Sequence, residues 1–251
     1  MNGGRLSVGV VGTGPVGAVL GQALASAGHM VIGVASTGGP TGTDGKTGTG
    51  PASGTVDFDY VEALLPEVPI LSVEQVVKQS DLVLFALEST ELLNVVSSVA
   101  ESGIFKSGQL VAHTAGEFGI DILLPAVDQG VIPLAIHPAM SFTGTTLDLA
   151  RIRESYFAVA APKIALPIAQ ALVIEMGAEP IVVSEEDRKT YFEAISVASN
   201  FSKLIVNQSI GLLESVGVEN ARAVLGPVIR SAVEEALAEG HTPINPEEFL
   251  S

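Results

Sequence analysis

The stretch LSVGVVGTGPVG, residues 6–17, decides the fold that the sequence predicts. Its apolar part, residues 6–11, has the length and β-branched content of a buried strand, and a helical pattern follows over residues 15–27. In such a unit the first glycine permits a tight turn, the second lets a pyrophosphate approach the backbone, and the third lets the helix pack closely on the strand. Unpaired N–H groups at the start of the helix attract the anion. We therefore expect a nicotinamide dinucleotide at Gly12, Thr13, Gly14, Pro15, Val16 and Gly17; the alternative is a glycine turn that no longer binds a cofactor.

Short apolar runs alternate with helical patterns through the first 183 residues. Further strands are expected at residues 30–35, 68–71, 82–87, 109–113, 131–137, 156–160 and 181–183, and further helices at 73–79, 91–100, 120–128 and 164–176. This alternation is typical of βαβ units, which build a doubly wound sheet. No strand signal follows, and two long helical patterns cover residues 186–215 and 219–238, the second interrupted near Gly226 and Pro227. We predict an α/β fold, with a doubly wound Rossmann-type dinucleotide-binding domain (residues 1–183) followed by a small all-helical domain (residues 184–251).

Composition argues against several classes of protein. The chain of 251 residues carries 12 Lys and Arg against 28 Asp and Glu, a net charge of −16, and no cysteine. The negative charge argues against nucleic acid and anionic membrane surfaces, because both attract basic proteins. The mean hydropathy of +0.46 is high, but no apolar run reaches the roughly 18–20 residues of a membrane helix; we attribute it to a buried parallel sheet and an apolar subunit interface. The lack of cysteine suits a reducing cytoplasm, and no His, Asp and Glu cluster has metal-ligand spacing, so we expect a cytoplasmic protein without a metal.

The end of the second predicted strand bears on the choice of cofactor. An NAD site usually places Asp or Glu there to bind the ribose 2′-hydroxyl, whereas this sequence has Ser36 and Thr37. The missing acid favours NADP, while NAD stays possible because no arginine follows to hold a 2′-phosphate. Residues 36–55 are rich in Gly and Thr and include Lys46. They form either a tolerated surface insertion or a flap over the adenosine end of the cofactor.

The carboxyl ends of parallel strands meet at one edge of a doubly wound sheet, where the cofactor lies. We therefore expect Leu87, Glu88 and Thr114 to contact the cofactor, the alternative for the first two being a plain loop turn. His113 and His137 also stand at strand ends and should project near the nicotinamide. A neutral imidazole can bind or protonate a carbonyl or imine near pH 7, so both are candidate catalytic or substrate-binding residues. The alternative for each is a hydrogen-bonded structural histidine.

The first long C-terminal helix carries a narrow polar stripe. Ser196, Asn200, Lys203 and Asn207 are spaced by four, three and four residues, which places them on one face among apolar neighbours. Such a stripe suits a helix that faces an interdomain cleft, with Lys203 as proton donor and the asparagines orienting the substrate; the alternative is a solvated face. Two helices with two apolar faces cannot bury both alone, so we also expect a homodimer through the C-terminal helices.

Four segments together resemble one known family. GTGPVG (12–17), HTAGEFG (113–119), AIHPAMSF (135–142) and YFEAISVASNF (191–201) occur in the order found in bacterial Rossmann-like proteins with an uncharacterised helical C-terminal domain. That family is distantly related to 6-phosphogluconate dehydrogenase and pyrroline-5-carboxylate reductase. The resemblance implies a cofactor loop, strand-end motifs and a helix asparagine at Gly12, Gly14, Gly17, His113, Gly116, His137, Pro138 and Asn200. Lys203 and Asn207 additionally resemble the lysine and asparagine of β-hydroxyacid dehydrogenases, whereas the Gly- and Thr-rich segment departs from the family by replacing an expected arginine.

These features predict an NADP-dependent oxidoreductase. Hydride would pass between the nicotinamide and a small carbonyl, imine or hydroxy acid held in a cleft between the domains. His137 and Lys203 are the candidates for acid–base catalysis, and Asn200 and Asn207 for orienting the substrate. Two alternatives stay open: a non-catalytic, nucleotide-sensing dimer that retains the Rossmann site, and a purely structural dimer with an empty site.

Overall fold

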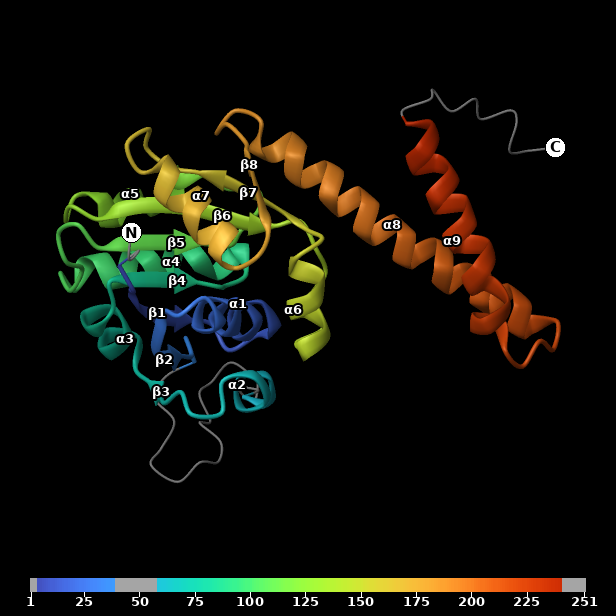
Figure 1. Cartoon of the computed structure of the whole chain (residues 1–251), viewed down its shortest axis with the longest axis horizontal. Helices are drawn as coiled ribbons and strands as arrows, with labels where there is room; N and C mark the ends of the chain where they lie inside the picture. The colour runs from blue at the N-terminus through green and yellow to red at the C-terminus, as the bar shows by residue number, and fades with distance from the viewer. Residues whose placement is uncertain (1–3, 39–57, 241–251) are drawn as a thin grey trace. The chain divides into compact units, whose positions relative to one another are not determined.

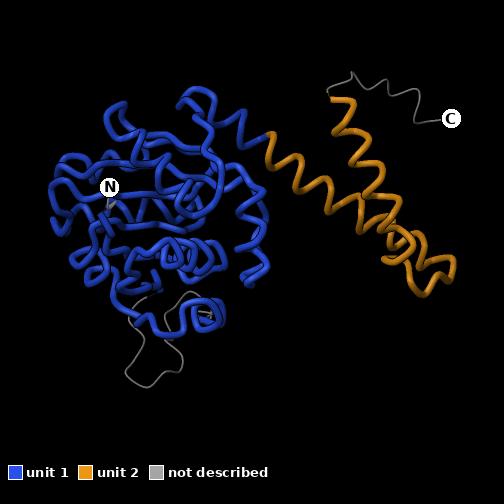
Figure 2. The backbone as a smooth tube through the Cα atoms, viewed as in Figure 1, with its two compact units in different colours: residues 1–193 blue, residues 194–251 orange. Residues whose placement is uncertain are grey.

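The computed structural model describes residues 4–38 and 58–240, and the chain divides into two compact units, residues 1–193 and 194–251 (Figure 2). The division falls within the helix α8 (Arg188–Ser215), whose start belongs to unit 1. The domain boundary expected at residue 184 stays a prediction.

One sheet organises unit 1 (Figure 1). Its strand order is β3-β2-β1-β4-β5-β6-β7-β8. All neighbouring strands pair in parallel except β6 and β7, which run antiparallel. This sheet confirms the predicted Rossmann-type architecture, and it adds a reversed pair of strands at one edge. The strands are β1 (Ser7–Val11), β2 (Met30–Ala35), β3 (Ile70–Leu71), β4 (Leu82–Phe85), β5 (Leu110–His113), β6 (Ile132–Pro138), β7 (Tyr156–Ala160) and β8 (Glu179–Val182).

Helices cover both faces of this sheet, and each face has its own apolar core. On one face, residues of α1, α2, α6 and α7 pack with the strands in a cluster that includes Leu20, Leu134 and Phe157. On the other face, α3, α4, η1 and α5 contribute to a second cluster that includes Val77 and Phe85. The central strands are therefore buried on both sides, which accounts for their uninterrupted apolar sequences. The helices of unit 1 are α1 (Pro15–Ser26), α2 (Asp59–Leu64), α3 (Val73–Gln79), α4 (Ser89–Glu101), η1 (Ile120–Leu123), α5 (Leu124–Val127), α6 (Thr146–Ile152) and α7 (Leu166–Glu175).

Some helices differ from those expected. α2 and α6 are short, with six and seven residues, and show too few turns for a clear periodic pattern. The single helix expected over residues 120–128 is instead a 3₁₀ turn, η1, followed by the short helix α5, because Pro125 stands at the start of a helix, where it is tolerated. The interruption expected near Gly226 is wrong, since the helix continues through Pro227; a proline removes one backbone bond without necessarily ending a helix.

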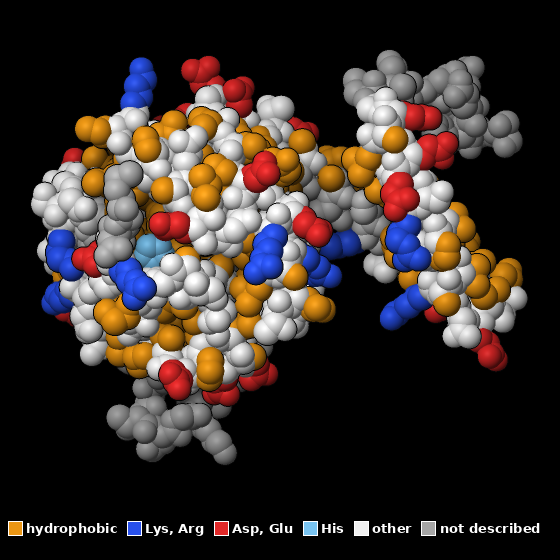
Figure 3. Space-filling view, viewed as in Figure 1, with side chains coloured by type: hydrophobic (Ala, Val, Ile, Leu, Met, Phe, Trp, Pro, Cys, Tyr) orange, Lys and Arg blue, Asp and Glu red, His pale blue; other side chains and the backbone are white. Residues whose placement is uncertain are grey.

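The described part of unit 2 contains the rest of α8 and a second helix, α9 (Ala221–Glu239). α8 ends where Gly217 adopts a positive φ of 84° and the Val218 N–H donates to the Leu213 carbonyl at 3.1 Å. Ala221 is the only fully buried residue among those described in this unit. Large apolar side chains instead stay exposed along both helices (Figure 3), among them Phe201, Leu204, Ile205, Leu212, Val224, Val228 and Leu237. Among the described residues, no helix combines the length and hydropathy needed to cross a membrane.

Candidate functional site

The candidate site lies where the winding of the sheet changes direction. β1 and β4 are neighbours at the centre, and the chain leaves them toward opposite sides of the sheet. A pocket of about 190 Å³ opens at the carboxyl ends of the central strands. It is lined by Val16, Leu87, Glu88, Ser89, Thr114, Ala115, Gly116, His137, Pro138, Met140, Phe142 and Phe192. Five segments that are distant in sequence therefore meet at this edge, all within unit 1.

The glycine turn after β1 has the geometry that its sequence predicts. Gly12 adopts φ +125°, which L side chains rarely adopt, and an added Cβ would collide with the Ala86 carbonyl. Its N–H donates to the Ala35 carbonyl at 2.8 Å. At Gly17 an added Cβ would lie 2.5 Å from the Gly12 carbonyl oxygen and 3.1 Å from Val10. The first glycine thus makes the turn, and the last lets α1 pack against β1.

Gly14 differs from both, because the space beside it is open. Within the described residues, no atom outside its own neighbours lies within 4 Å of a Cβ built there. Gly14 is the N-cap of α1, Pro15 follows in the first turn, and no side chain caps the helix or places an acidic group there. The first backbone N–H groups of α1 therefore lack side-chain partners, and the partial positive charge of the helix start is uncompensated. This combination fits the pyrophosphate of a dinucleotide.

The other predicted cofactor contacts gather near this turn. Val16, Leu87, Glu88 and Thr114 line the pocket, and the Thr114 N–H donates to the Phe85 carbonyl at 3.2 Å. Ser36 and Thr37 follow β2, whose last residue, Ala35, pairs with the last residue of β1. The part of the Gly- and Thr-rich segment that contains Lys46 lies outside the described residues. The cofactor-binding roles stay predictions, while the shared location of these residues agrees with them.

His137, near the end of β6, also lines the pocket. Its Nδ1 lies 3.0 Å from the Tyr191 hydroxyl. The Tyr191 and Phe192 rings meet the imidazole edge-on, with centroids 5.6 Å and 6.0 Å away. Burial, reinforced by the positive charge of Arg188, lowers the pKa of His137 to about 4. The ring is therefore neutral at pH 7.

The proton between His137 and Tyr191 can be assigned from their charges. Burial raises the pKa of the Tyr191 phenol, so the hydroxyl keeps its proton at neutral pH. We assign this hydroxyl as the donor to Nδ1, which leaves the imidazole proton on Nε2. Nε2 lies close over Gly116, where an added Cβ would sit 2.7 Å from it and 2.6 Å from Phe192. The arrangement presents a neutral N–H donor beside the pocket.

Sequence reasoning missed Tyr191 as a partner of His137. The two residues are separated by 54 positions, and no local pattern connects a strand end to the first turn of a distant helix. The one available signal was the YF pair in the segment 191–201, because Tyr191 and Phe192 both reach the histidine.

His113 takes a different place from the one expected. Its side chain is fully buried, its Nε2 lies 2.8 Å from the Gly119 carbonyl, and it is not part of the pocket lining. Burial is also the main reason that its pKa falls to about 4. The geometry favours the structural alternative, in which neutral His113 donates to Gly119 and holds the loop after β5.

The three polar residues expected from the C-terminal helix lie in unit 2. Asn200, Lys203 and Asn207 follow one another along α8, and all three side chains are exposed in the single chain. Their catalytic and orienting roles stay predictions.

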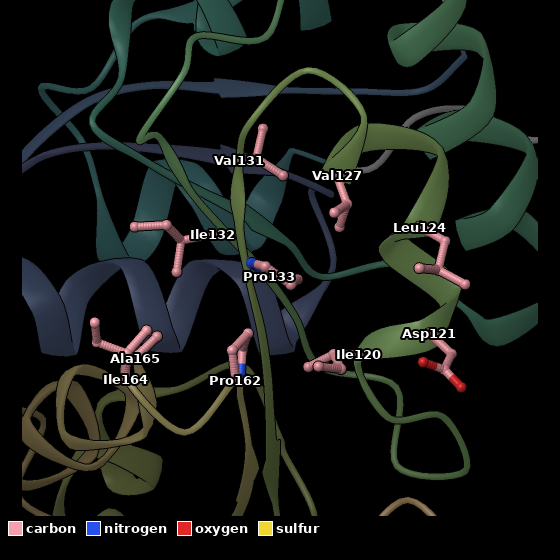
Figure 4. A pocket seen from close by; sticks show the side chains of 10 residues that line it. All are labelled: Ile120, Asp121, Leu124, Val127, Val131, Ile132, Pro133, Pro162, Ile164 and Ala165. Atoms are coloured by element: carbon pink, nitrogen blue, oxygen red, sulfur yellow. The ribbon is translucent and has the colours of Figure 1, made fainter.

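A second, apolar pocket of about 280 Å³ lies elsewhere in unit 1 (Figure 4). It lies between the η1–α5 segment and the start of α7, across the beginning of β6, and Asp121 is the one charged residue in its lining. It lacks the polar groups that would orient a reacting substrate. Within residues 4–38 and 58–240, no group of three or more His, Asp or Glu side chains could hold a metal ion.

Sequence comparison matches both parts of the chain to known domains. Residues 1–43 and 52–138 match the Rossmann-like domain, and residues 155–244 match a domain of unknown function, DUF2520. Comparison with curated proteins finds no match.

Solved structures with a similar fold include several reductases. A Bacteroides fragilis protein, provisionally described as an NADP oxidoreductase, is 16% identical with a TM-score of 0.69, over 92% of this chain and 80% of its own. The 1-pyrroline-5-carboxylate reductase of Streptococcus pyogenes is 16% identical with a TM-score of 0.64, over 98% and 84%. The pyrroline carboxylate reductase of Plasmodium falciparum, solved with NADP bound, is 14% identical with a TM-score of 0.61, over 96% and 82%. At these identities the likeness shows the fold alone.

Proposed function

The chain belongs to the Rossmann-like family, with a DUF2520 domain after the Rossmann-like one, and from this premise we propose that it is an NADP-dependent oxidoreductase. Its substrate is a small carbonyl, imine or hydroxy acid, and hydride passes between C4 of the nicotinamide and a carbon of the substrate. The fold neighbours include reductases, one of them solved with NADP. The reaction class, the cofactor and the cytoplasmic location are parts of this proposal.

One observation carries the proposal. Val16, in the first turn of α1, and His137, near the end of β6, line the same pocket at the carboxyl edge of the sheet. An anion-binding helix start and a neutral proton-bearing ring are thus close enough to serve one small ligand and one dinucleotide.

The residues of the glycine turn fit a dinucleotide. Gly12 shapes the turn, Gly14 leaves open space over the backbone, and the N–H groups at the start of α1 would hold the pyrophosphate. The bound dinucleotide would supply the hydride chemistry. NADP is favoured because Ser36, rather than an acid, follows β2 and would not repel a 2′-phosphate.

His137 and Tyr191 handle the proton in this proposal. Neutral His137 donates a hydrogen bond from Nε2 to the carbonyl oxygen or imine nitrogen of the substrate, which favours the build-up of negative charge there during reduction. The Tyr191 hydroxyl, 3.0 Å from Nδ1, fixes the tautomer. As Nε2 gives up its proton, the hydroxyl can pass its own to Nδ1 while it takes a proton from solvent water, so that Tyr191 stays neutral. The reverse transfers accompany oxidation of a hydroxy acid.

We also propose a homodimer through the helices of unit 2. The exposed apolar side chains of α8 and α9 and the near absence of a core among the described residues of this unit support a partner surface. Asn200, Lys203 and Asn207 keep their proposed roles in catalysis and substrate orientation.

The proposal is tested by separating the two roles of the glycines. In G14V the new side chain enters open space at a φ of −70°, so the free energy of unfolding should fall by no more than about 1 kcal/mol, the usual cost of a poor N-cap residue. The same side chain obstructs the pyrophosphate, so NADPH affinity, measured by calorimetric titration, should fall at least about tenfold. G4V is the matched control, because Gly4 also has nothing within 4 Å among the described residues.

Two results would contradict the proposal: wild-type protein that does not bind NADPH or NADH, or G14V that binds NADPH as tightly as wild type. Tight binding without oxidation of NADPH across a panel of keto acids and imines would instead favour the nucleotide-sensing alternative.

A further inference from the structure

Arg188, at the start of α8, is a buried cation without a counter-ion. Its side chain is 1% exposed, and its Nε and Nη1 have no hydrogen-bond partner within the described part of the chain. Its remaining nitrogen, Nη2, donates to the Ala158 carbonyl at 3.4 Å, near the upper limit for a hydrogen bond. A guanidinium stays charged in proteins even where burial lowers its pKa, as it does here. Such a charge is strongly unfavourable unless an anion pairs with it.

Glu185, the acid whose negative charge acts on Arg188, does not form an ion pair with it. Glu185 raises the pKa of Arg188 through its negative charge, but its side chain is exposed and its Oε1 accepts from the Ile120 N–H at 2.7 Å. Among the ion pairs of the described residues, none joins Glu185 to Arg188. The anion that Arg188 requires must therefore come from outside the described part of unit 1.

Two independent relations place Arg188 beside the candidate site. Ala158, whose carbonyl it contacts, is the cross-strand partner of His137 in the β6–β7 pair. Tyr191 and Phe192 follow Arg188 by three and four residues on α8, so all three lie on one face of the helix. Tyr191 forms a hydrogen bond with His137, and Phe192 is part of the pocket lining. The unpaired guanidinium is thus close enough to His137 and Tyr191 for its charge to act on both.

We infer that Arg188 binds a carboxylate of the substrate, so that the substrate is a small keto acid, imino acid or hydroxy acid rather than an uncharged ketone or imine. This inference rests on the proposed function, because it assigns a substrate class to the same pocket. The three N–H groups on Nε and Nη1 are the donors for the carboxylate oxygens. Arg188 is not part of the pocket lining, so the guanidinium must turn toward the pocket to reach the ligand, and one long hydrogen bond, to Ala158, is given up when it does.

A carboxylate fits better than a phosphate. One guanidinium balances the single charge of a carboxylate, whereas a phosphate dianion would keep an unbalanced charge in a buried site. Glu88 in the pocket lining adds a negative charge that further disfavours a dianion. The pocket, about 190 Å³, also suits a small ligand.

The test compares acids with their uncharged esters. NADP⁺-saturated protein is titrated with pyruvate, 2-oxobutanoate and pyrrole-2-carboxylate, and with the methyl ester of each, and binding is followed by NMR. We expect at least one acid to bind wild type about tenfold or more tightly than its ester. R188M should bind that acid about 10- to 100-fold more weakly than wild type does and should no longer prefer the acid over its ester. K189M is the control, since it removes the same charge from the neighbouring, exposed residue and should keep the preference.

A thermal-unfolding measurement separates ligand binding from a structural role. Replacing an unpaired buried charge by an apolar side chain of similar length is often neutral or stabilising, so R188M should unfold at the same or a higher temperature than wild type. R188Q, which keeps a polar end group without the charge, serves the same purpose if R188M does not fold.

Three results would overturn the inference: no acid binds, wild type prefers no acid over its ester, or the charge-free variants keep the preference. NADPH titration of the same proteins keeps the two proposals apart. A wild type that does not bind NADPH refutes the proposed function, whereas variants that bind NADPH normally and still prefer acids refute only the assignment of Arg188.

Discussion

The two units of this chain differ in how far they bury their apolar side chains. In unit 1 the sheet and its helices bury large side chains completely, with Phe85 and Phe157 both at 0% exposure. In unit 2 comparable side chains stay in contact with solvent, with Phe201 at 58% and Leu212 at 63%. Because burial of apolar surface drives both folding and association, the first pattern indicates a self-sufficient core, and the second is the pattern expected of the dimer surface that we propose.

The division into two units also decides which conclusions about the candidate site rest on the structure and which rest on the proposed dimer. Every residue that lines the candidate pocket belongs to unit 1, so its geometry follows from that unit alone. Lys203 and the two asparagines belong to unit 2, and their part in the chemistry depends on an assembly that remains a proposal. Three experiments can sharpen or break this contrast.

The largest effect is expected from a matched pair of phenylalanine substitutions. F157A removes a fully buried ring from the core of unit 1 and should lower the free energy of unfolding by about 3–5 kcal/mol at any protein concentration. F201A removes an exposed ring on α8 and should matter only where the dimer forms, so its effect should grow with protein concentration. Urea unfolding at two protein concentrations, with light scattering for the mass, measures both. If F201A lowered the free energy of unfolding as much as F157A does, and equally at both protein concentrations, the contrast between the two units would be contradicted.

A smaller effect is expected from acid, and it should arise in unit 1. The pKa of His113 is about 4 in the folded protein against 6.5 as the ordinary value, so the unfolded chain binds more protons between these values. The stability due to neutral His113 is complete above pH 6.5 and is lost as the pH falls toward 4, amounting to about 2 kcal/mol between pH 7.5 and pH 5. Urea unfolding at the two pH values measures this loss.

H113Q serves as the comparison for that titration. Its amide can still donate to the Gly119 carbonyl but does not titrate, so its pH dependence should be weaker than that of wild type by about the same 2 kcal/mol. An equal pH dependence in both proteins would show that His113 is not buried in its neutral form.

The smallest change in stability is expected at Lys203, which is exposed. K203A should alter the free energy of unfolding by less than about 0.5 kcal/mol, yet lower turnover with NADPH by at least tenfold if Lys203 donates a proton. K163A removes another exposed lysine, from unit 1, and should leave turnover unchanged. Full turnover in K203A would remove its catalytic role and leave the chemistry to unit 1.

Much of the fold could be predicted because its signals are local. The strand before Gly12, the spacing of the three glycines and the helix after them all lie within one short stretch, and each glycine has a distinct geometric reason to be there. The helices α2 and α6 were missed because they are too short to show a periodic pattern. The reversal of β7 could not be predicted, since strand direction depends on pairing between segments far apart in the chain.

The candidate site shows the same limit. His137 was identified from its place at a strand end, but its partner Tyr191 and the buried charge of Arg188 depend on where α8 packs against the sheet. His113 was singled out by the same rule as His137, although only one of the two faces the pocket. Position at a strand end predicts the edge of the sheet at which a side chain lies, and packing alone decides whether that side chain is accessible.

The loop after β5 is held in place before any ligand binds, and this affects how the pocket beside it can recognise a ligand. Two hydrogen bonds hold it, one between His113 Nε2 and the Gly119 carbonyl and one from the Ile120 N–H to Glu185 Oε1. Because folding already restricts this loop, the part of the pocket lining near Gly116 has its bound conformation before a ligand enters. The conformational entropy of this loop is therefore lost during folding and not during ligand binding. The pocket can then select ligands by a shape that exists before they bind.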